Sequence, residues 1–152
     1  MRNPKRIQPI WNCFIEYLKQ NKFPLEKVLP LKEEWLKYTD YRLGQLIDNN
    51  DFKTGQKELS EFLQSKIDRM LFHIEDNDLL LALGIPVRDF FIWGKNYDEN
   101  GNQLEKTEYI LLKDMGTDHI ENVIKYLIEN NNLNNIQLFK DELELRRLDN
   151  TN

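Results

Sequence analysis

The residues best suited to metal or acid–base chemistry fall in two short stretches, and the first begins at His73. If this part of the chain is extended, His73 and Glu75 share one face. Two aspartates follow closely, Asp76 and Asp78. A histidine with carboxylates can bind a divalent metal ion. The same acidic cluster is typical of a helix start, because carboxylates are favourable near the N–H groups of a first turn. We interpret the stretch as a helix boundary and predict no metal site.

The second stretch contains Asp114, Asp118 and His119. His119 lies one turn before Asn122 on the helix expected from Thr117 onward. A histidine at this position either hydrogen-bonds the preceding loop or contacts a bound partner. The first role is the simpler interpretation, and the second makes His119 a candidate binding residue.

The chain contains few side chains that could act as a catalytic nucleophile. The serines, Ser60 and Ser65, lie on the polar side of a helical pattern with no histidine near them in sequence. Cys13 is the single cysteine, which excludes an internal disulfide and a cysteine-built zinc site. The six glycines are scattered, so there is no glycine-rich phosphate loop. We predict no catalytic residues and no cofactor.

Length and composition are those of one globular domain: 152 residues, of which 40% are hydrophobic. We predict a single domain over residues 1–152, with a helical half at 1–86 and a β-hairpin plus two helices at 87–152. The net charge of −5 argues against a broad nucleic-acid surface. Residues 1–22 are the local exception, with five basic side chains and one acidic one.

The N-terminal residues predict no signal peptide, because the basic start precedes an amphipathic helical pattern and not an apolar run. No run approaches the roughly 18 apolar residues of a membrane span. We therefore expect a cytoplasmic protein without a membrane segment.

Two short helical patterns meet at Asp40, within residues 34–50. Asp40 is placed to cap the second helix, because its carboxylate can accept from the first backbone N–H groups. Gly44 inside that helix costs roughly 1 kcal/mol relative to alanine, which predicts close packing against another backbone. We also expect Arg42 to pair with a carboxylate from residues 75–78; otherwise it is free for a ligand or simply solvated.

A β-hairpin is indicated by Asn100-Gly101, a strong turn dipeptide between the aromatic-rich segments 88–93 and 108–112. Apolar residues at helical spacing predict five or six helices in the rest of the chain. The expected fold is therefore α+β and mainly α-helical, with one two-stranded antiparallel β-hairpin.

The hairpin and the helix after it offer the best candidate for a binding site. His119, Asn122 and Tyr126 fall on one flank of that helix, at i, i+3 and i+7. If the Trp93 side of the hairpin faces this flank, an aromatic and polar groove results, with Trp93 as its anchor. The alternative is that these residues pack against one another within the core.

Two parts of the chain resemble groups of small bacterial and phage proteins that have no assigned activity. The first resemblance covers roughly the first half of the chain and rests on Arg2 to Ile7, Trp35, Tyr41 to Asn49, and Ile74 to Leu80. It departs in the proline-containing connection at 21–31 and in a longer segment at 57–67. The second resembles a pattern in small phage and prophage proteins and rests on Trp93-Gly94, the Asn-Gly hairpin and Leu112 to Ile124. Both resemblances imply a bacterial or phage origin and leave the chemistry open.

These observations favour a non-catalytic binding or regulatory protein whose partner is another protein. A nucleic-acid-associated accessory protein that uses the basic N-terminal helix is the alternative. An enzyme of an unrecognised class is the third, and the oligomeric state is left open.

Overall fold

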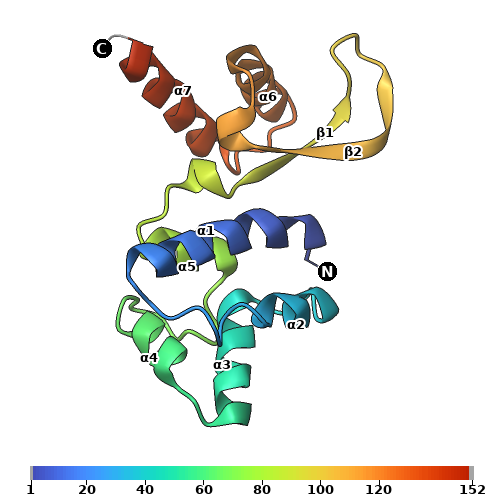
Figure 1. Cartoon of the computed structure of the whole chain (residues 1–152). Coiled ribbons are helices and arrows are strands. Elements are labelled where there is room, and N and C mark those ends of the chain that lie inside the picture. The colour runs from blue at the N-terminus through green and yellow to red at the C-terminus, as the bar shows by residue number, and fades with distance from the viewer. Residues whose placement is uncertain (1, 151–152) are drawn as a thin grey trace. The chain divides into compact units, whose positions relative to one another are not determined.

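The computed structural model describes residues 2–150, and the chain divides after Phe91 into two compact units (Figure 1). The division lies close to the junction expected after residue 86. None of the helices in the described residues has the length and apolar character needed to cross a bilayer.

The first unit is entirely helical in its regular structure. Its α-helices are α1 (Ile7–Gln20), α2 (Leu31–Lys37), α3 (Leu43–Thr54), α4 (Glu58–Gln64) and α5 (Asp76–Ala82), with 3-10 turns η1 (Pro4–Arg6) and η2 (Val87–Asp89). α1 packs against α5 and α2, and α3 packs against α2, α4 and α5 (Figure 1).

The core of this unit is formed by the apolar faces of its helices. Along α1 the buried residues recur at helical spacing: Ile7, Ile10, Trp11, Phe14 and Leu18. The side chains of Trp35 from α2 and Leu63 from α4 are fully buried in the same cluster. Asn3 caps the first turn by accepting from the backbone N–H of Lys5.

The close packing predicted at Gly44 is confirmed. A Cβ atom at this position would lie 2.1 Å from the carbonyl oxygen of Leu71, well inside van der Waals contact. α3 can therefore approach the 71–74 segment only because residue 44 has no side chain.

The second unit is a hairpin followed by two helices. Its elements are β1 (Ile92–Tyr97), β2 (Gln103–Leu111), the 3-10 turn η3 (Leu112–Asp114), α6 (Thr117–Glu129) and α7 (Ile136–Asn150). β1 and β2 are antiparallel, with Trp93 opposite Ile110, and an irregularity interrupts the register between Lys95 and Tyr97. At the tip, Asp98 accepts from the backbone N–H groups of Asn100 and Asn102, which lowers the pKa of its carboxyl group.

Arg146 of α7 joins three elements of the second unit. Its guanidinium donates to Glu142 Oε2 at 2.7 Å and to Thr117 Oγ1, at the start of α6, at 3.1 Å. It also donates to the carbonyl oxygen of Leu112 in η3 at 3.2 Å. Glu142 is almost fully buried, so this charged pair lies within the unit and fixes the junction of η3, α6 and α7.

The predicted fold class is confirmed: residues 2–150 contain seven α-helices and one antiparallel hairpin. The helix count exceeds the expected five or six, because α2, α4 and α5 are separate helices of only seven residues. The first strand begins later than its aromatic residues suggested. Phe90 belongs to the core of the first unit, and pairing starts at Ile92.

Candidate binding pocket

The most densely bonded charged group of the first unit is the guanidinium of Arg6. It donates to Asp76 Oδ2 at 2.8 Å and to the carbonyl oxygen of Tyr41 at 2.9 Å. It also lies over the ring of Trp35, 5.4 Å from the ring centroid, and the indole N–H of Trp35 donates to the same Tyr41 carbonyl. Stretches that carry the first sequence resemblance thus meet in one bonded network.

The prediction that Asp40 caps the following helix, α3, is wrong. The carboxylate of Asp40 accepts from the backbone N–H of Arg2, and α3 begins later, at Leu43. The cap comes from a distant residue: Asp76 Oδ1 accepts from the buried backbone N–H of Leu43 at 2.7 Å. Asp76 therefore neutralises Arg6 with one oxygen and satisfies the start of α3 with the other.

The prediction that Arg42 pairs with a carboxylate is also wrong. Its guanidinium donates twice to the carbonyl oxygen of Phe72, at 2.9 and 3.3 Å, and lies over the Phe72 ring. The carboxylates of residues 75 and 76 are bound by Arg2 and Arg6. Arg42 therefore anchors the 71–74 segment to the start of α3, and its hydrogen bonds are structural.

The other predicted site residues lie in the second unit. Trp93 is half-buried on β1, and its ring meets that of Phe139 edge-on at 5.4 Å. His119 is half-buried; burial first, and then the positive charge of Lys95, lower its pKa. Asn122 and Tyr126 are exposed on α6. Trp93 and Lys95 share one face of β1. Trp93 contacts Phe139 of α7, and Lys95 acts electrostatically on His119 of α6, so this face of β1 interacts with both helices. The binding role of Trp93, His119, Asn122 and Tyr126 stays a prediction.

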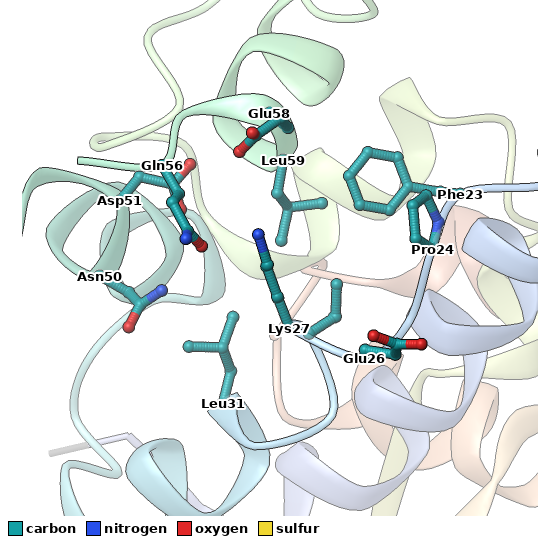
Figure 2. A pocket seen from close by; sticks show the side chains of 11 residues that line it. Phe23, Pro24, Glu26, Lys27, Leu31, Asn50, Asp51, Gln56, Glu58 and Leu59 are labelled. Carbon is teal, nitrogen blue, oxygen red and sulfur yellow. The ribbon is translucent and has the colours of Figure 1, made fainter. Parts of the chain in front are cut away.

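A pocket of about 220 Å³ opens in the first unit, at residues for which no site was predicted (Figure 2). It lies where the connection between α1 and α2 meets the end of α3 and the start of α4. Its apolar lining consists of Phe23, Pro24, Val28, Leu31 and Leu59, and its polar lining of Glu26, Lys27, Asn50, Asp51, Gln56 and Glu58.

The connection at residues 22–31 is held by backbone hydrogen bonds and apolar contacts. The backbone N–H of Phe23 donates to the Leu18 carbonyl at the end of α1, and those of Val28 and Leu29 donate to Leu25. Val28 is buried, and the Phe23 ring packs against that of Phe62 at 5.2 Å. These contacts hold the apolar wall of the pocket in place.

The polar end of the pocket is organised by Asp51, which is 5% exposed. Its Oδ2 accepts from the backbone N–H of Ser60 at 2.9 Å, which ties the end of α3 to the first turn of α4. Within the described residues no fully buried side-chain oxygen lacks a partner. Oδ1 has no hydrogen bond within residues 2–150, so it is not fully buried, and Asp51 is one of the residues that line the pocket.

Charge in the pocket is unevenly distributed. Three carboxylates and one ammonium group line it. Figure 2 shows Phe23 and Pro24 at one end and Asn50, Asp51 and Gln56 at the other, with the Lys27 nitrogen turned toward Gln56 and Glu58. Within the described part of the chain, this nitrogen forms no ion pair or hydrogen bond. The pocket therefore combines an apolar wall with an acidic end.

The volume limits what the pocket can hold. Small-molecule and cofactor sites usually measure about 300–1,000 Å³, whereas a cavity of about 150 Å³ accommodates benzene. About 220 Å³ is thus too small for a nucleotide-sized cofactor and large enough for one amino-acid side chain.

Sequence reasoning missed the pocket because its residues come from two separate stretches of the chain, 23–31 and 50–59. The available signal was the proline-bracketed segment from Pro24 to Pro30, whose apolar residues exceed what an exposed connection needs. Nothing in local spacing links that segment to Asp51 or Glu58.

The described residues contain no group of three or more histidine, cysteine, aspartate or glutamate side chains arranged to hold a metal ion. Comparison with known proteins gives no assignment. No protein-family model, curated protein or solved structure matches this chain.

Proposed function

We propose that this chain is a non-catalytic binding protein that recognises a single side chain of a partner protein in the pocket at the α3–α4 junction. The observation that carries the proposal is the pocket itself: about 220 Å³, with a fixed apolar wall and acceptor groups at one end. Concave sites with an apolar lining and a few convergent polar groups are the usual form of binding sites.

The size favours a protein partner over a free cofactor. Many protein–protein interfaces are stabilised by an anchor residue of one protein whose side chain is buried in a pocket of the other. We further propose a bacterial or phage origin, which rests on the sequence resemblance, and a cytoplasmic location.

The nucleic-acid alternative has weaker support. Of the basic side chains near the N-terminus, Arg2 and Arg6 are bonded to Glu75 and Asp76. The exposed remainder, Lys5, Lys19 and Lys22, is divided between the two ends of α1. An α-helix of 14 residues is about 21 Å long, so these charges do not form one compact patch.

The test is selection of displayed random peptides on the intact protein and on a variant with a blocked pocket. Gln56→Trp places a large ring at the exposed rim, and Glu61→Trp places the same ring on α4 outside the lining. We expect enriched peptides to bind the unmodified protein and the Glu61→Trp variant equally, and to lose at least about tenfold in affinity on Gln56→Trp. Peptides that bind all three proteins equally, or no enrichment at all, would refute the proposal.

A further inference from the structure

The acidic end of the pocket contains a buried carboxylate of fixed orientation, in addition to exposed carboxylates. Asp51 is more than nine-tenths buried, and the backbone N–H of Ser60 fixes one of its oxygens. Oδ1 has no hydrogen bond within the described residues, and Asp51 lines the pocket. A buried carboxylate of fixed orientation gains most from a charged donor, because charge-assisted hydrogen bonds are about twice as strong as neutral ones.

The charges of the lining select the sign of the guest. Three carboxylates, those of Glu26, Asp51 and Glu58, and one cation, Lys27, line the pocket, so the lining carries an excess of negative charge. Asp51 and Glu58 belong to the polar end, and Glu26 lies near Pro24 (Figure 2). An anionic guest would have to approach these three carboxylates with a single ammonium group to balance them. A cationic guest is attracted by the same arrangement.

The apolar wall selects the shape of the guest. The buried side chains of Val28, Leu31 and Leu59 can cover an alkyl stem, and the Phe23 ring lies at the far end from Asp51 (Figure 2). Long basic side chains bury their methylene groups along apolar surface while the charged head reaches polar partners.

The acceptors favour a guanidinium over an ammonium group. Carboxylate and amide oxygens are available from Asp51, Glu58, Asn50 and Gln56, which lie on different sides of the polar end (Figure 2). A guanidinium presents five N–H donors in a planar fork, whereas an ammonium group is a compact charge with three.

Lys27 occupies part of this space in the isolated chain. Its side chain is exposed, its stem is flexible, and its nitrogen is turned toward the acidic end without a partner in the described residues (Figure 2). A bound cation would have to displace the Lys27 ammonium group, because two positive charges within one small pocket repel each other.

We propose that the pocket binds an arginine side chain of the partner protein, with its guanidinium at Asp51, and that Lys27 competes for the same position. This inference rests on the proposed function, since it assumes that the pocket receives a side chain from a protein.

The experiment is an NMR titration of the ¹⁵N-labelled full chain with blocked pentapeptides, Ala-Ala-Xaa-Ala-Ala. Xaa is arginine, lysine, citrulline or norleucine. Citrulline keeps the shape of arginine without the charge, and norleucine keeps only the stem. We expect the arginine peptide to shift the backbone resonances of the pocket residues and to bind about tenfold more tightly than the citrulline peptide.

Two variants locate the interaction. Asp51→Asn keeps an oxygen for the Ser60 N–H and should weaken arginine binding about tenfold while leaving citrulline binding unchanged. Lys27→Met should strengthen arginine binding severalfold. Glu61→Gln and Lys53→Met make the same charge changes outside the lining and should have no effect. If Asp51→Asn does not fold, Glu58→Gln at the exposed rim replaces it.

The outcomes separate the two proposals. Equal binding of the arginine, citrulline and norleucine peptides at the pocket would overturn the choice of arginine and leave the proposed function standing. A lysine peptide that binds as tightly as the arginine peptide would overturn the guanidinium assignment. If no peptide shifts the pocket resonances, the arginine proposal fails, and the proposed function fails with it if the displayed-peptide selection also gives no enrichment.

Discussion

Asp76 accepts hydrogen bonds from two distant parts of the chain at once. One oxygen pairs with Arg6 and the other caps the buried backbone N–H of Leu43. The side chains of Arg6 and Asp76 are 14% and 6% exposed, so this ion pair is largely shielded from water. Removal of one partner from such a pair costs more than the pair contributes, because the remaining charge is left without compensation.

We therefore expect Asp76→Ala to lower the free energy of unfolding by about 3–5 kcal/mol. The measurement is urea unfolding followed by circular dichroism. The control is Asp78→Ala, two residues away, which breaks the exposed pair with Arg69 and should cost at most about 1 kcal/mol. Equal losses for the two variants would show that the Arg6–Asp76 pair does not have the structural role assigned to it.

At the residue scale, the sequence predicted the structural role of a residue in two situations. Either its contact partner is close in sequence, or its residue type has few possible roles at that position. Asn3 as a cap follows from its position before Pro4, and Gly44 has few reasons to occur inside a helix. The partners of Asp40 and Arg42 could not be predicted. Each is chosen by a contact across the fold, from Arg2 and Phe72, and spacing along the chain contains no information about those contacts.

Helix α3 depends on a missing side chain. Its residue Gly44 lies against the backbone of Leu71, where a Cβ atom would be 2.1 Å from the carbonyl oxygen. Alanine is the better helix former by about 1 kcal/mol, but the collision acts against a rigid backbone atom. Overpacking of this kind typically costs about 1–3 kcal/mol, so the collision outweighs the gain in helix propensity.

Gly44→Ala should accordingly destabilise the protein by about 1–3 kcal/mol. Thermal and urea unfolding measure the change. Asn49→Ala in the same helix brings a smaller propensity gain, up to about 0.7 kcal/mol, without the collision, and should be neutral or slightly stabilising. A Gly44→Ala variant more stable than the parent would show that α3 is free to move away from the 71–74 segment.

At the element scale, the order and type of the helices followed from apolar periodicity, while the ends of the elements did not. The expected strand at 88–93 shows why. Its aromatic residues divide between two units: Phe90 is in the first core, whereas Trp93 packs on Phe139 in the second. A run of aromatic residues favours burial without specifying which core provides it. The pocket could not be predicted for the same reason, because Lys27, Asp51 and Glu58 meet only in the folded unit.

At the scale of the whole molecule, each unit has its own buried core. The cluster of the first unit extends from Ile7 to Phe90 and contains no residue of the second. A segment with its own hydrophobic core has what independent folding requires.

We expect a fragment of residues 1–91 to be helical and to unfold cooperatively. Circular dichroism and urea unfolding of the purified fragment test this, and the Asp76→Ala change in the fragment should reproduce its cost in the full chain. A fragment without a cooperative transition would support the alternative that residues 1–152 form one inseparable domain.

The ion pair between Arg6 and Asp76 also has a consequence for synthesis on the ribosome. The two residues are 70 positions apart, so the first helix leaves the ribosome long before its partner is made. At about 5–20 residues per second, α1 would wait several seconds for α5, with only α2 available to cover its apolar face. During this interval the nascent chain is a substrate for chaperones, and release from them should coincide with the emergence of the 71–83 segment.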